Sequence, residues 1–439
     1  MMLRPMGRAV TASMLSLAMA LGVTACSNDY TVSYLYMSSS KTLPHGLINA
    51  YQIDYQSGSL LPLADSPIDT GGRDTVGLVV APNNLFLYTV NNFDSDVVEF
   101  AIGTDGKLYP QNTYNISGSL PTAAAIDASG KFLYVTFTYQ NTASGAELYT
   151  PANPGPGGIS IFPINSDNTL GTPFTVNAGR NPVGITASVQ NITGTGTTCI
   201  IGCQQHFLYV IEQDSATSTN LLAYSFISST SSTVATVSGP VTPLAGVTIN
   251  PGNVPSTGYA TGTSPSGILE DATGTHLYVS DSVSNQIWSY SIGANGVPVP
   301  IDNTSSQPVL APTEEGPMGM AFDLSGKYLY VVAYTANTID TYAIGPNGFA
   351  LGSGGEPVRL ASVPAGTGPT CVTVSGAPSN ANPSHAEYLY TSNALSNNVT
   401  GEQLNPQDGS LVQIPGEPFG GSALPTCAVT VPAFPLRNP

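Results

Sequence analysis

Short apolar runs in which branched or aromatic residues alternate with polar ones recur along most of the chain. Two examples are FLYVTF at 132–137 and QIWSYSI at 286–292, and clusters of Gly, Pro, Asn and Asp separate such runs. Alternation with a period of two is typical of β-strands, and these cluster residues are typical of turns. Only 8% of the residues are charged, so the charged stretches of surface helices are missing. The pattern predicts an all-β protein.

A Leu-Tyr pair lies inside seven of the apolar runs, and successive pairs are about 59 residues apart on average, a spacing typical of structural repeats. Most pairs follow the same upstream pattern: Pro, any residue, a small residue and an apolar run, then a tight turn such as DASGK at 127–131. A third run, a Gly-containing turn and a weaker fourth run follow each pair. The pairs are Leu35-Tyr36, Leu87-Tyr88, Leu133-Tyr134, Leu208-Tyr209, Leu277-Tyr278, Leu329-Tyr330 and Leu389-Tyr390.

Each repeat therefore indicates four antiparallel strands, named a to d, with the Leu-Tyr pair in strand b. Seven such units predict a seven-bladed β-propeller over residues 34–433, followed by a tail at 434–439. Strand a is innermost, where its small residue lets neighbouring backbones approach. The first repeat lacks a Pro-x-small strand, and PTCAVTV at 425–431 provides one at the other end of the chain. We therefore expect the C-terminal strand to join the first blade and close the ring.

The first 25 residues are of a different kind. Arg4 and Arg8 precede an apolar run of small residues at 12–23. This layout is typical of a secretory signal peptide, and the run is too short to span a membrane. We expect residues 1–25 to be removed during export.

The signal-like segment ends in TAC at 24–26, and small residues before a cysteine resemble the lipobox of bacterial lipoproteins. We expect Cys26 to be lipidated at the start of a linker, residues 26–33. The alternative is ordinary cleavage after Ala25, which would leave Cys26 unmodified. A lipidated Cys26 would place the protein in the cell envelope, at the periplasmic or the outer-membrane face.

The chain is strongly acidic, with a formal net charge of −17. Such a surface repels nucleic acid and anionic lipid. We therefore expect no nucleic-acid partner, contact with a membrane only through the lipid anchor, and a monomer.

Four cysteines besides Cys26 lie beyond the expected cleavage site. Cys199 and Cys203 are four residues apart in a Gly- and Thr-rich stretch, where an exported protein could form a small disulfide or keep two free thiols. A metal site is less favoured, because no second Cys/His pair has suitable spacing. Cys371 and Cys427 occupy the small position of strand a in two consecutive blades. We expect these strands to be too far apart for a disulfide and the thiols to act as small buried residues.

The sequence PMGMAFDLSGKYLYVV at 317–332, with NTIDTYAI at 337–344, shows the blade pattern in full. This pattern, over about residues 34–433, resembles the seven-bladed lactonase family, which includes 6-phosphogluconolactonases and carboxymuconate cyclases. The resemblance implies a propeller that hydrolyses a lactone. Lactonase-type members place His and Arg where strand a begins, whereas this chain has NPVG at 181–184 and GPMG at 316–319. The same blade pattern also occurs in exported surface propellers of the YVTN type.

Chain direction sorts the connections onto two faces. The d–a and b–c connections, including a long b–c loop at 138–158, share a face that we call the loop face. The a–b and c–d turns share the opposite face, the turn face. Long loops on a rigid scaffold commonly carry function. Three histidines, His206, His276 and His385, precede strand b, and we expect them to be exposed turn residues.

Charged residues at the starts of strands a and in the b–c loops are the candidate site. Lactone opening requires a group that stabilises an oxyanion and a base that activates water. Arg73 or Arg180 could provide the first, and Glu212 or Glu315 the second. Either arginine could instead belong to a structural ion pair. Further candidates for ligand binding are Asp74, Asp214, Asp281 and Glu314.

A non-catalytic propeller that binds a protein or glycan partner is the alternative function. It would use aromatic side chains of the loop face, with Tyr149 and Tyr334 the main candidates for contact with a ligand. The remaining members of this aromatic cluster are Phe93, Phe137 and Tyr139. We expect no cofactor and no metal site. Loop carboxylates could bind Ca²⁺, but the chain has no Asp-x-Asp-x-Asp-Gly loop of the kind that typically does so.

Overall fold

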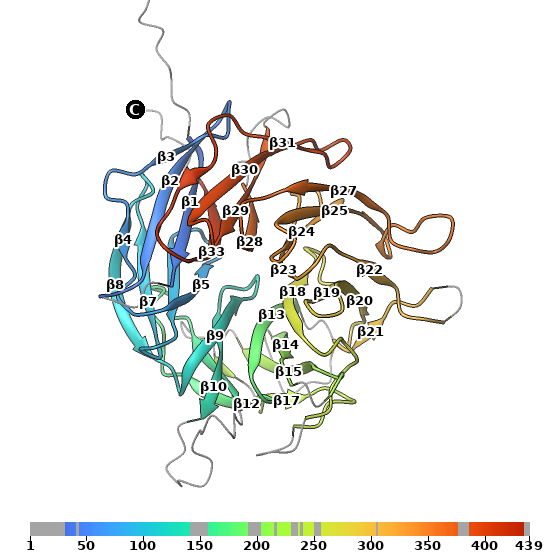
Figure 1. Cartoon of the computed structure of the whole chain (residues 1–439). Helices are drawn as coiled ribbons and strands as arrows, with labels where there is room; N and C mark the ends of the chain where they lie inside the picture. The colour runs from blue at the N-terminus through green and yellow to red at the C-terminus, as the bar shows by residue number, and fades with distance from the viewer. Residues whose placement is uncertain are drawn as a thin grey trace, which may run out of the picture. The chain divides into compact units, whose positions relative to one another are not determined.

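The structure is a computed structural model that describes residues 31–40, 44–140, 157–191, 203–214, 217–229, 236–237, 240–249, 256–303, 306–375 and 386–433. Within these ranges every regular element is a β-strand, and no helix could cross a membrane. The strands form seven antiparallel sheets around a common axis (Figure 1). The all-β, seven-bladed prediction is confirmed.

Each blade runs from an innermost strand a to an outermost strand d. The first blade consists of β33 (Pro425–Pro432), β1 (Thr31–Ser39), β2 (Leu47–Asp54), β3 (Leu60–Pro62) and β4 (Ile68–Asp69). The second consists of β5 (Thr75–Val80), β6 (Phe86–Asn91), β7 (Asp96–Ile102) and β8 (Leu108–Asn115). The third consists of β9 (Gly118–Ile126), β10 (Phe132–Gln140), β11 (Gly158–Pro163) and β12 (Phe174–Asn177).

The fourth and fifth blades consist of β13 (Pro182–Asn191), β14 (Gln204–Glu212), β15 (Leu221–Ser229), β16 (Thr236–Val237) and β17 (Thr242–Pro243); and β18 (Pro265–Glu270), β19 (His276–Asp281), β20 (Gln286–Ile292), β21 (Pro298–Pro300) and β22 (Leu310–Pro312). The sixth and seventh consist of β23 (Pro317–Phe322), β24 (Tyr328–Ala333), β25 (Thr338–Gly345), β26 (Gly348–Phe349) and β27 (Arg359–Pro364); and β28 (Pro369–Val374), β29 (Glu387–Asn393), β30 (Asn398–Leu404), β31 (Leu411–Gln413) and β32 (Phe419–Gly420).

The weak fourth run of the repeat is split in five blades. Two short pieces, such as β3 and β4 in the first blade, pair side by side with the two ends of strand c. The sequence pattern predicted a single fourth strand in each blade. The break between the two short pieces could not be seen from the pattern, because both pieces follow strand c and precede the next strand a.

Closure of the ring follows the prediction. The C-terminal strand β33 pairs antiparallel with β1, so that Tyr36 lies opposite Val429. The seven inner strands contact one another in a closed cycle, with β33 between β28 and β5 (Figure 1). The first blade therefore contains both ends of the folded chain.

The Leu-Tyr pair joins consecutive blades. All seven pairs are fully buried, and the two side chains of each pair point to opposite faces of their sheet. In the first blade Leu35 packs in the interface with the seventh blade and Tyr36 in the interface with the second. The Tyr36 hydroxyl donates to the carbonyl oxygen of Gly106 at 2.6 Å, in the c–d turn of the second blade.

The same tyrosine contact recurs around the ring. Four further pairs of donor and acceptor have this arrangement: Tyr88 with Asn168, Tyr209 with Gly296, Tyr330 with Gly409 and Tyr390 with Gly58. All five acceptors have positive φ, which orients the turn carbonyl toward the neighbouring blade. The repeated Tyr therefore serves the seam between blades as well as the core.

Candidate functional site

Arg73 and Arg180 occupy equivalent positions in the repeat. Each lies on the loop face, two residues before the first residue of an inner strand, Thr75 in β5 and Pro182 in β13. Each also forms an ion pair with an aspartate from the b–c loop of its own blade, Asp94 for Arg73 and Asp214 for Arg180. The two arginines therefore allow a direct comparison between the second and the fourth blade.

In the second blade the pair is well bonded and open to solvent. The backbone amide of Arg73 donates to Asp94 at 2.7 Å, and its Nε and Nη2 groups both donate to the other carboxylate oxygen. The ring of the exposed Phe93 lies 6.0 Å from the guanidinium carbon. The hydrogen bond from Arg73 lowers the pKa of Asp94. This arrangement matches the structural ion pair that the sequence left open.

Beneath the second-blade pair, the last residue of strand b is an amide with partners for both of its polar atoms. The Thr75 hydroxyl donates to Asn91 Oδ1 at 2.7 Å, and Asn91 Nδ2 donates to Asp96 at 2.8 Å. Asn91 is fully buried. A buried amide with both ends bonded is a stable structural element.

In the fourth blade the same position is Glu212, and its bonding is incomplete. Glu212 is fully buried, and neither of its carboxyl oxygens has a hydrogen bond of good geometry among the described residues, although the Arg180 backbone amide lies beside the carboxyl. Arg180 Nη1 contacts Asp214 Oδ2 at 3.2 Å, while the buried Arg180 Nε lacks a partner within the same ranges. Three of the predicted site residues thus converge, with buried polar atoms left unsatisfied.

Burial sets the charge of Glu212. It raises the pKa of Glu212 to about 8; the nearby amide and guanidinium of Arg180 lower it only in part, and the charge of Asp214 adds to the rise. The carboxyl is therefore mostly protonated at neutral pH, and only Asp214 neutralises Arg180 there. Unsatisfied, perturbed groups of this kind are typical of functional sites.

A glycine in the d–a connection covers Glu212. A side chain at Gly179 would overlap the Glu212 carboxyl, and one at Gly72 would overlap Asn91 in the second blade. A side chain at either glycine would therefore force the buried Glu212 or Asn91 side chain to move. Glu212 is therefore enclosed between Gly179 and the Arg180–Asp214 pair, out of direct contact with solvent.

The other predicted residues lie apart from this cluster. Glu315 is exposed, and Glu314 forms an ion pair with Arg359 of the outer strand β27 at 3.0 Å. Asp281 is fully buried and accepts backbone bonds from Ser264, Val283 and Ser284. Asp74 has a φ of 56°, and burial raises its pKa.

The predicted aromatic cluster is not a continuous surface. Phe137 is fully buried beneath Gly118 and Gly158, so its inclusion was wrong; it occupies the blade position of Asn91 and Glu212. Tyr334 is half-buried, and Tyr149 lies outside the described residues.

A belt of side chains that the sequence analysis missed orders the loop-face ends of the inner strands. Each donates to a backbone carbonyl of the next inner strand, at the strand's first residue except for Pro121, which is the fourth residue of β9. The hydroxyl donors are Thr122 to Pro182, Ser266 to Pro317, Thr370 to Pro425 and Thr426 to Thr75, and the amide donors are Asn92 to Pro121 and Gln213 to Pro265. The signal in the sequence was the hydroxyl residue after the strand-a Pro.

Comparison with known proteins identifies the family. The profile of the family described as "Lactonase, 7-bladed beta-propeller" matches residues 34–191 and 227–374. The chain belongs to this family. It is 26% identical over 349 residues to a 6-phosphogluconolactonase of Erwinia tasmaniensis, a match that covers 74% of this chain and 94% of the relative.

Two solved structures show the same fold as this lactonase-family chain. A putative 6-phosphogluconolactonase of Bacteroides fragilis superposes with a TM-score of 0.62 at 16% identity, over 92% of this chain and 99% of the other. A periplasmic gluconolactonase of Pseudomonas aeruginosa superposes with a TM-score of 0.61 at 15% identity, over 92% and 100%.

A buried Asp-His-Ser array joins the third and fourth blades of the lactonase fold. His206 Nδ1 lies 2.7 Å from Asp127 Oδ2, and His206 Nε2 lies 2.7 Å from Ser228 Oγ. Burial opposes ionisation of Asp127, but hydrogen bonds from His206, Ser129 and Tyr134 hold its pKa below the usual value. The order of atoms resembles a hydrolytic triad, but all three residues are fully buried and the imidazole stacks on Phe226 at 4.6 Å. The array therefore holds two blades together.

The expectation that the histidines are exposed was wrong for His206. Strand β14 begins at Gln204, before His206 rather than after it, so that His206 lies inside the sheet and contacts Phe132 of the third blade. His276 is mostly buried and pairs with Asp271 at 2.8 Å, whereas His385 lies outside the described residues.

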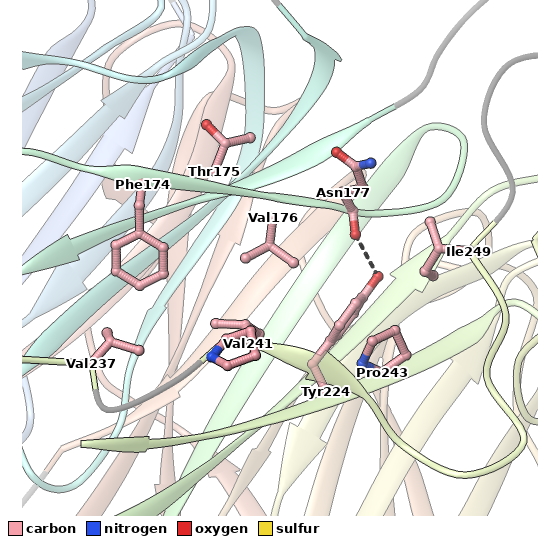
Figure 2. Close-up of a pocket in the computed structure, with 10 residues that line it drawn as sticks. Phe174, Thr175, Val176, Asn177, Tyr224, Val237, Val241, Pro243 and Ile249 are labelled. Carbon is pink, nitrogen blue, oxygen red and sulfur yellow. Dashed lines mark hydrogen bonds between the residues drawn. The ribbon is translucent and has the colours of Figure 1, made fainter.

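A groove of about 660 Å³ lies between the third and fourth blades (Figure 2). Its walls are mainly apolar, with Phe174 and Val176 of β12 facing Tyr224 of β15 and Val241, and the Tyr224 hydroxyl donates to Asn177 O at 3.0 Å. No carboxylate, histidine or basic side chain is among its lining residues. Within the described ranges, no three His, Cys, Asp or Glu side chains gather as metal ligands would.

Proposed function

We propose that this chain hydrolyses a sugar lactone at the fourth-blade cluster of Arg180, Glu212 and Asp214. The observation that carries the proposal is the buried Glu212 carboxyl, which has no hydrogen-bond partner in the described structure and lies beside an arginine with an unsatisfied Nε. Membership of the lactonase family and the likeness to a 6-phosphogluconolactonase support the choice of substrate class.

Arg180 is the oxyanion-stabilising group in this proposal. Attack of water on the lactone carbonyl places negative charge on the carbonyl oxygen, and a guanidinium beside that oxygen stabilises the charge. Arg180 is the most exposed member of the cluster, with 21% of its side chain accessible against 5% for Asp214.

Asp214 takes the role of water-activating base, which the sequence analysis gave to Glu212 or Glu315. Glu212 is fully buried beneath Gly179, whereas Asp214 keeps 5% of its side chain accessible and contacts the more exposed Arg180. Glu212 acts as a positioning residue. While it is protonated, Arg180 has one anionic neighbour, and ionisation of Glu212 would add a second and weaken the field at the oxyanion.

The test is hydrolysis of glucono-δ-lactone and of 6-phosphogluconolactone, followed by acid release. Arg180→Gln should lower kcat about 100- to 1,000-fold, as loss of an oxyanion donor does elsewhere. Arg73→Gln is the matched control, because it removes the equivalent arginine of the second blade, and it should retain activity. Wild-type protein that releases no acid above the buffer rate would overturn the proposal and favour the non-catalytic binding function.

We also propose that the chain is exported and anchored in the cell envelope through a lipid on Cys26. The signal-like run at 12–23 and the small residues before Cys26 support this. Wild-type protein should partition into the detergent phase, and Cys26→Ala should move to the aqueous phase. Continued detergent partitioning of Cys26→Ala would contradict lipidation at this residue.

A further inference from the structure

Cys371 and Cys427 lie in direct contact across the seam that closes the ring. Cys371 is in β28 of the seventh blade, and Cys427 is in β33, the C-terminal strand of the first blade. Their sulfur atoms are 3.0 Å apart. This corrects the expectation that the two inner strands are too far apart to bring the thiols together.

The close contact follows from the blade repeat. Both cysteines occupy the small position of strand a, where the other five blades have Gly or Ala. At this position consecutive inner strands nearly touch: a Cβ added at Gly319 would lie 2.9 Å from the carbonyl oxygen of Thr370 and 3.0 Å from the Cα of Cys371. Two side chains larger than Ala at consecutive small positions must therefore meet.

From this geometry we propose that Cys371 and Cys427 form a disulfide that joins the seventh blade to the closing strand. A disulfide has a sulfur separation of about 2.05 Å, so the bond requires a movement of about 1 Å from the observed contact. Rotation of two side chains and a small shift of two strands provide a movement of this size.

The surroundings favour thiol–disulfide exchange. The Ala428 backbone amide donates to Cys371 Sγ at 3.3 Å, and the contact with the Cys427 thiol lowers the pKa of Cys371. The same contact raises the pKa of Cys427 well above its usual value. Cys371 is thus the more acidic thiol of the pair, and both residues are partly exposed.

The oxidant is a small-molecule disulfide such as glutathione disulfide. The Cys371 thiolate attacks one of its sulfurs, the S–S bond breaks, and one glutathione thiolate leaves. Cys427, after losing its proton to solvent, then attacks the Cys371 sulfur and displaces the second glutathione thiolate. Two protein thiols lose two electrons and two protons, and one disulfide reagent becomes two thiols.

The bond would strengthen ring closure. The cysteines are 56 positions apart, and the loop between them holds strands b, c and d of the seventh blade. By the chain-entropy relation, a crosslink over a loop of this length should raise the melting temperature by about 5 °C in a domain of this size. The strand β33, which closes the propeller, would become covalently attached to the neighbouring blade.

The test uses the full folded chain. Protein is first treated with a mild reductant, then equilibrated with glutathione disulfide, alkylated and digested without reduction. The expected result is a crosslinked peptide pair that contains Cys371 and Cys427, and a melting temperature about 5 °C above that of the reduced protein.

Cys427→Ala and Cys371→Ala are the matched variants, because Ala occupies this position in the third blade. Cys203 is already in a disulfide, which the reductant could also open. Because the wild type and both variants keep Cys203, any change in melting temperature from that bond is the same in all three proteins. Recovery of both thiols as alkylated residues, or a melting shift in wild type no larger than in Cys427→Ala, would overturn the proposal.

Discussion

In the second blade strand b ends with Asn91, and in the fourth it ends with Glu212. Both residues are fully buried, both lie under a glycine of the d–a connection, and both are near an arginine–aspartate pair on the loop face. Asn91 has hydrogen-bond partners on both sides, whereas Glu212 has none in the described structure. The same scaffold position therefore holds a satisfied amide in one blade and an unsatisfied acid in the other.

The difference teaches how a repeat fold acquires a site. An amide has both a donor and an acceptor, so it can link Thr75 to Asp96; a buried carboxyl must keep its proton or obtain donors. Glu212 keeps its proton at neutral pH, so Arg180, like Arg73, is paired with one aspartate. Arg73 binds that aspartate through two guanidinium nitrogens and its backbone amide, whereas Arg180 contacts Asp214 only through Nη1 at 3.2 Å. A carboxyl in place of a buried amide thus makes the charge beneath the surface pair dependent on pH.

The largest contrast should appear when the aspartates are neutralised. Asp214→Asn should lower kcat for lactone hydrolysis about 100- to 1,000-fold, because it removes the proposed base. Asp94→Asn, its counterpart in the second blade, should keep kcat within about twofold. Both are measured by acid release under saturating substrate, with circular dichroism as a check of folding. Equal losses in the two variants would break the comparison between the blades.

The second-largest effect should be a change in the pH dependence of the free energy of unfolding when Glu212 is replaced. The folded-state pKa of Glu212, about 8, exceeds its ordinary value of 4.5, so the folded state retains a proton that the unfolded chain releases. Its contribution to stability is complete below about pH 4.5 and is lost as pH rises through 8. Glu212→Gln should therefore be more stable than wild type at pH 9 by up to about 5 kcal/mol, and no more stable at pH 4.

Chemical denaturation at both pH values measures this difference, and Glu356→Gln, at an exposed glutamate, is the control. A stability difference between Glu212→Gln and wild type that does not change with pH would mean that Glu212 is ionised in the folded protein.

A smaller effect is expected in the pH–rate profile. Ionisation of Glu212 above pH 8 should reduce kcat of the wild type about tenfold between pH 7 and pH 9, after correction for spontaneous hydrolysis. Glu212→Gln mimics the protonated form and should lose this decline. Wild-type activity that instead rises toward pH 8 would assign Glu212 the role of base that the sequence first suggested.

The smallest effect concerns the second-blade pair as a structural element. Asp94→Asn should change the melting temperature by no more than about 1 °C, because exposed ion pairs contribute little to stability. The hydrogen bond from the Arg73 backbone survives with an amide at this position. A melting temperature several degrees lower would show that the Arg73–Asp94 pair contributes substantially to stability.

The fold was predictable because its information is local and repeated seven times. The Leu-Tyr pair, the small residue of strand a and the spare C-terminal strand together gave the blade number and the closure. Chain direction also placed Arg73 and Arg180 at equivalent positions, since each precedes an inner strand on the same face.

Side-chain environment could not be predicted in the same way. The ends of strand b read similarly as VNNFD at 90–94 and VIEQD at 210–214, yet Asn91 is bonded by Thr75 of the neighbouring strand, whereas the Glu212 carboxyl lies unbonded beneath Gly179. Burial of His206 depended on a strand that starts early, and the Cys371–Cys427 contact on a neighbouring blade. These properties depend on contacts between strands that are distant in the sequence, and such contacts leave no periodic pattern in a single sequence.

The tyrosine of strand b donates to a turn that belongs to the following blade, as Tyr36 does to Gly106 and Tyr390 to Gly58 across the closure. Five of the seven blades are joined to the next one in this way; Tyr134 instead donates to Asp127 of its own blade, and the Tyr278 hydroxyl has no partner in the described structure. Where the contact is present, donor and acceptor come from different repeats, so no single repeat completes it. A deletion that removed half of such a repeat would therefore separate a tyrosine hydroxyl from its turn, whereas the repeat as a whole carries both halves of the pattern.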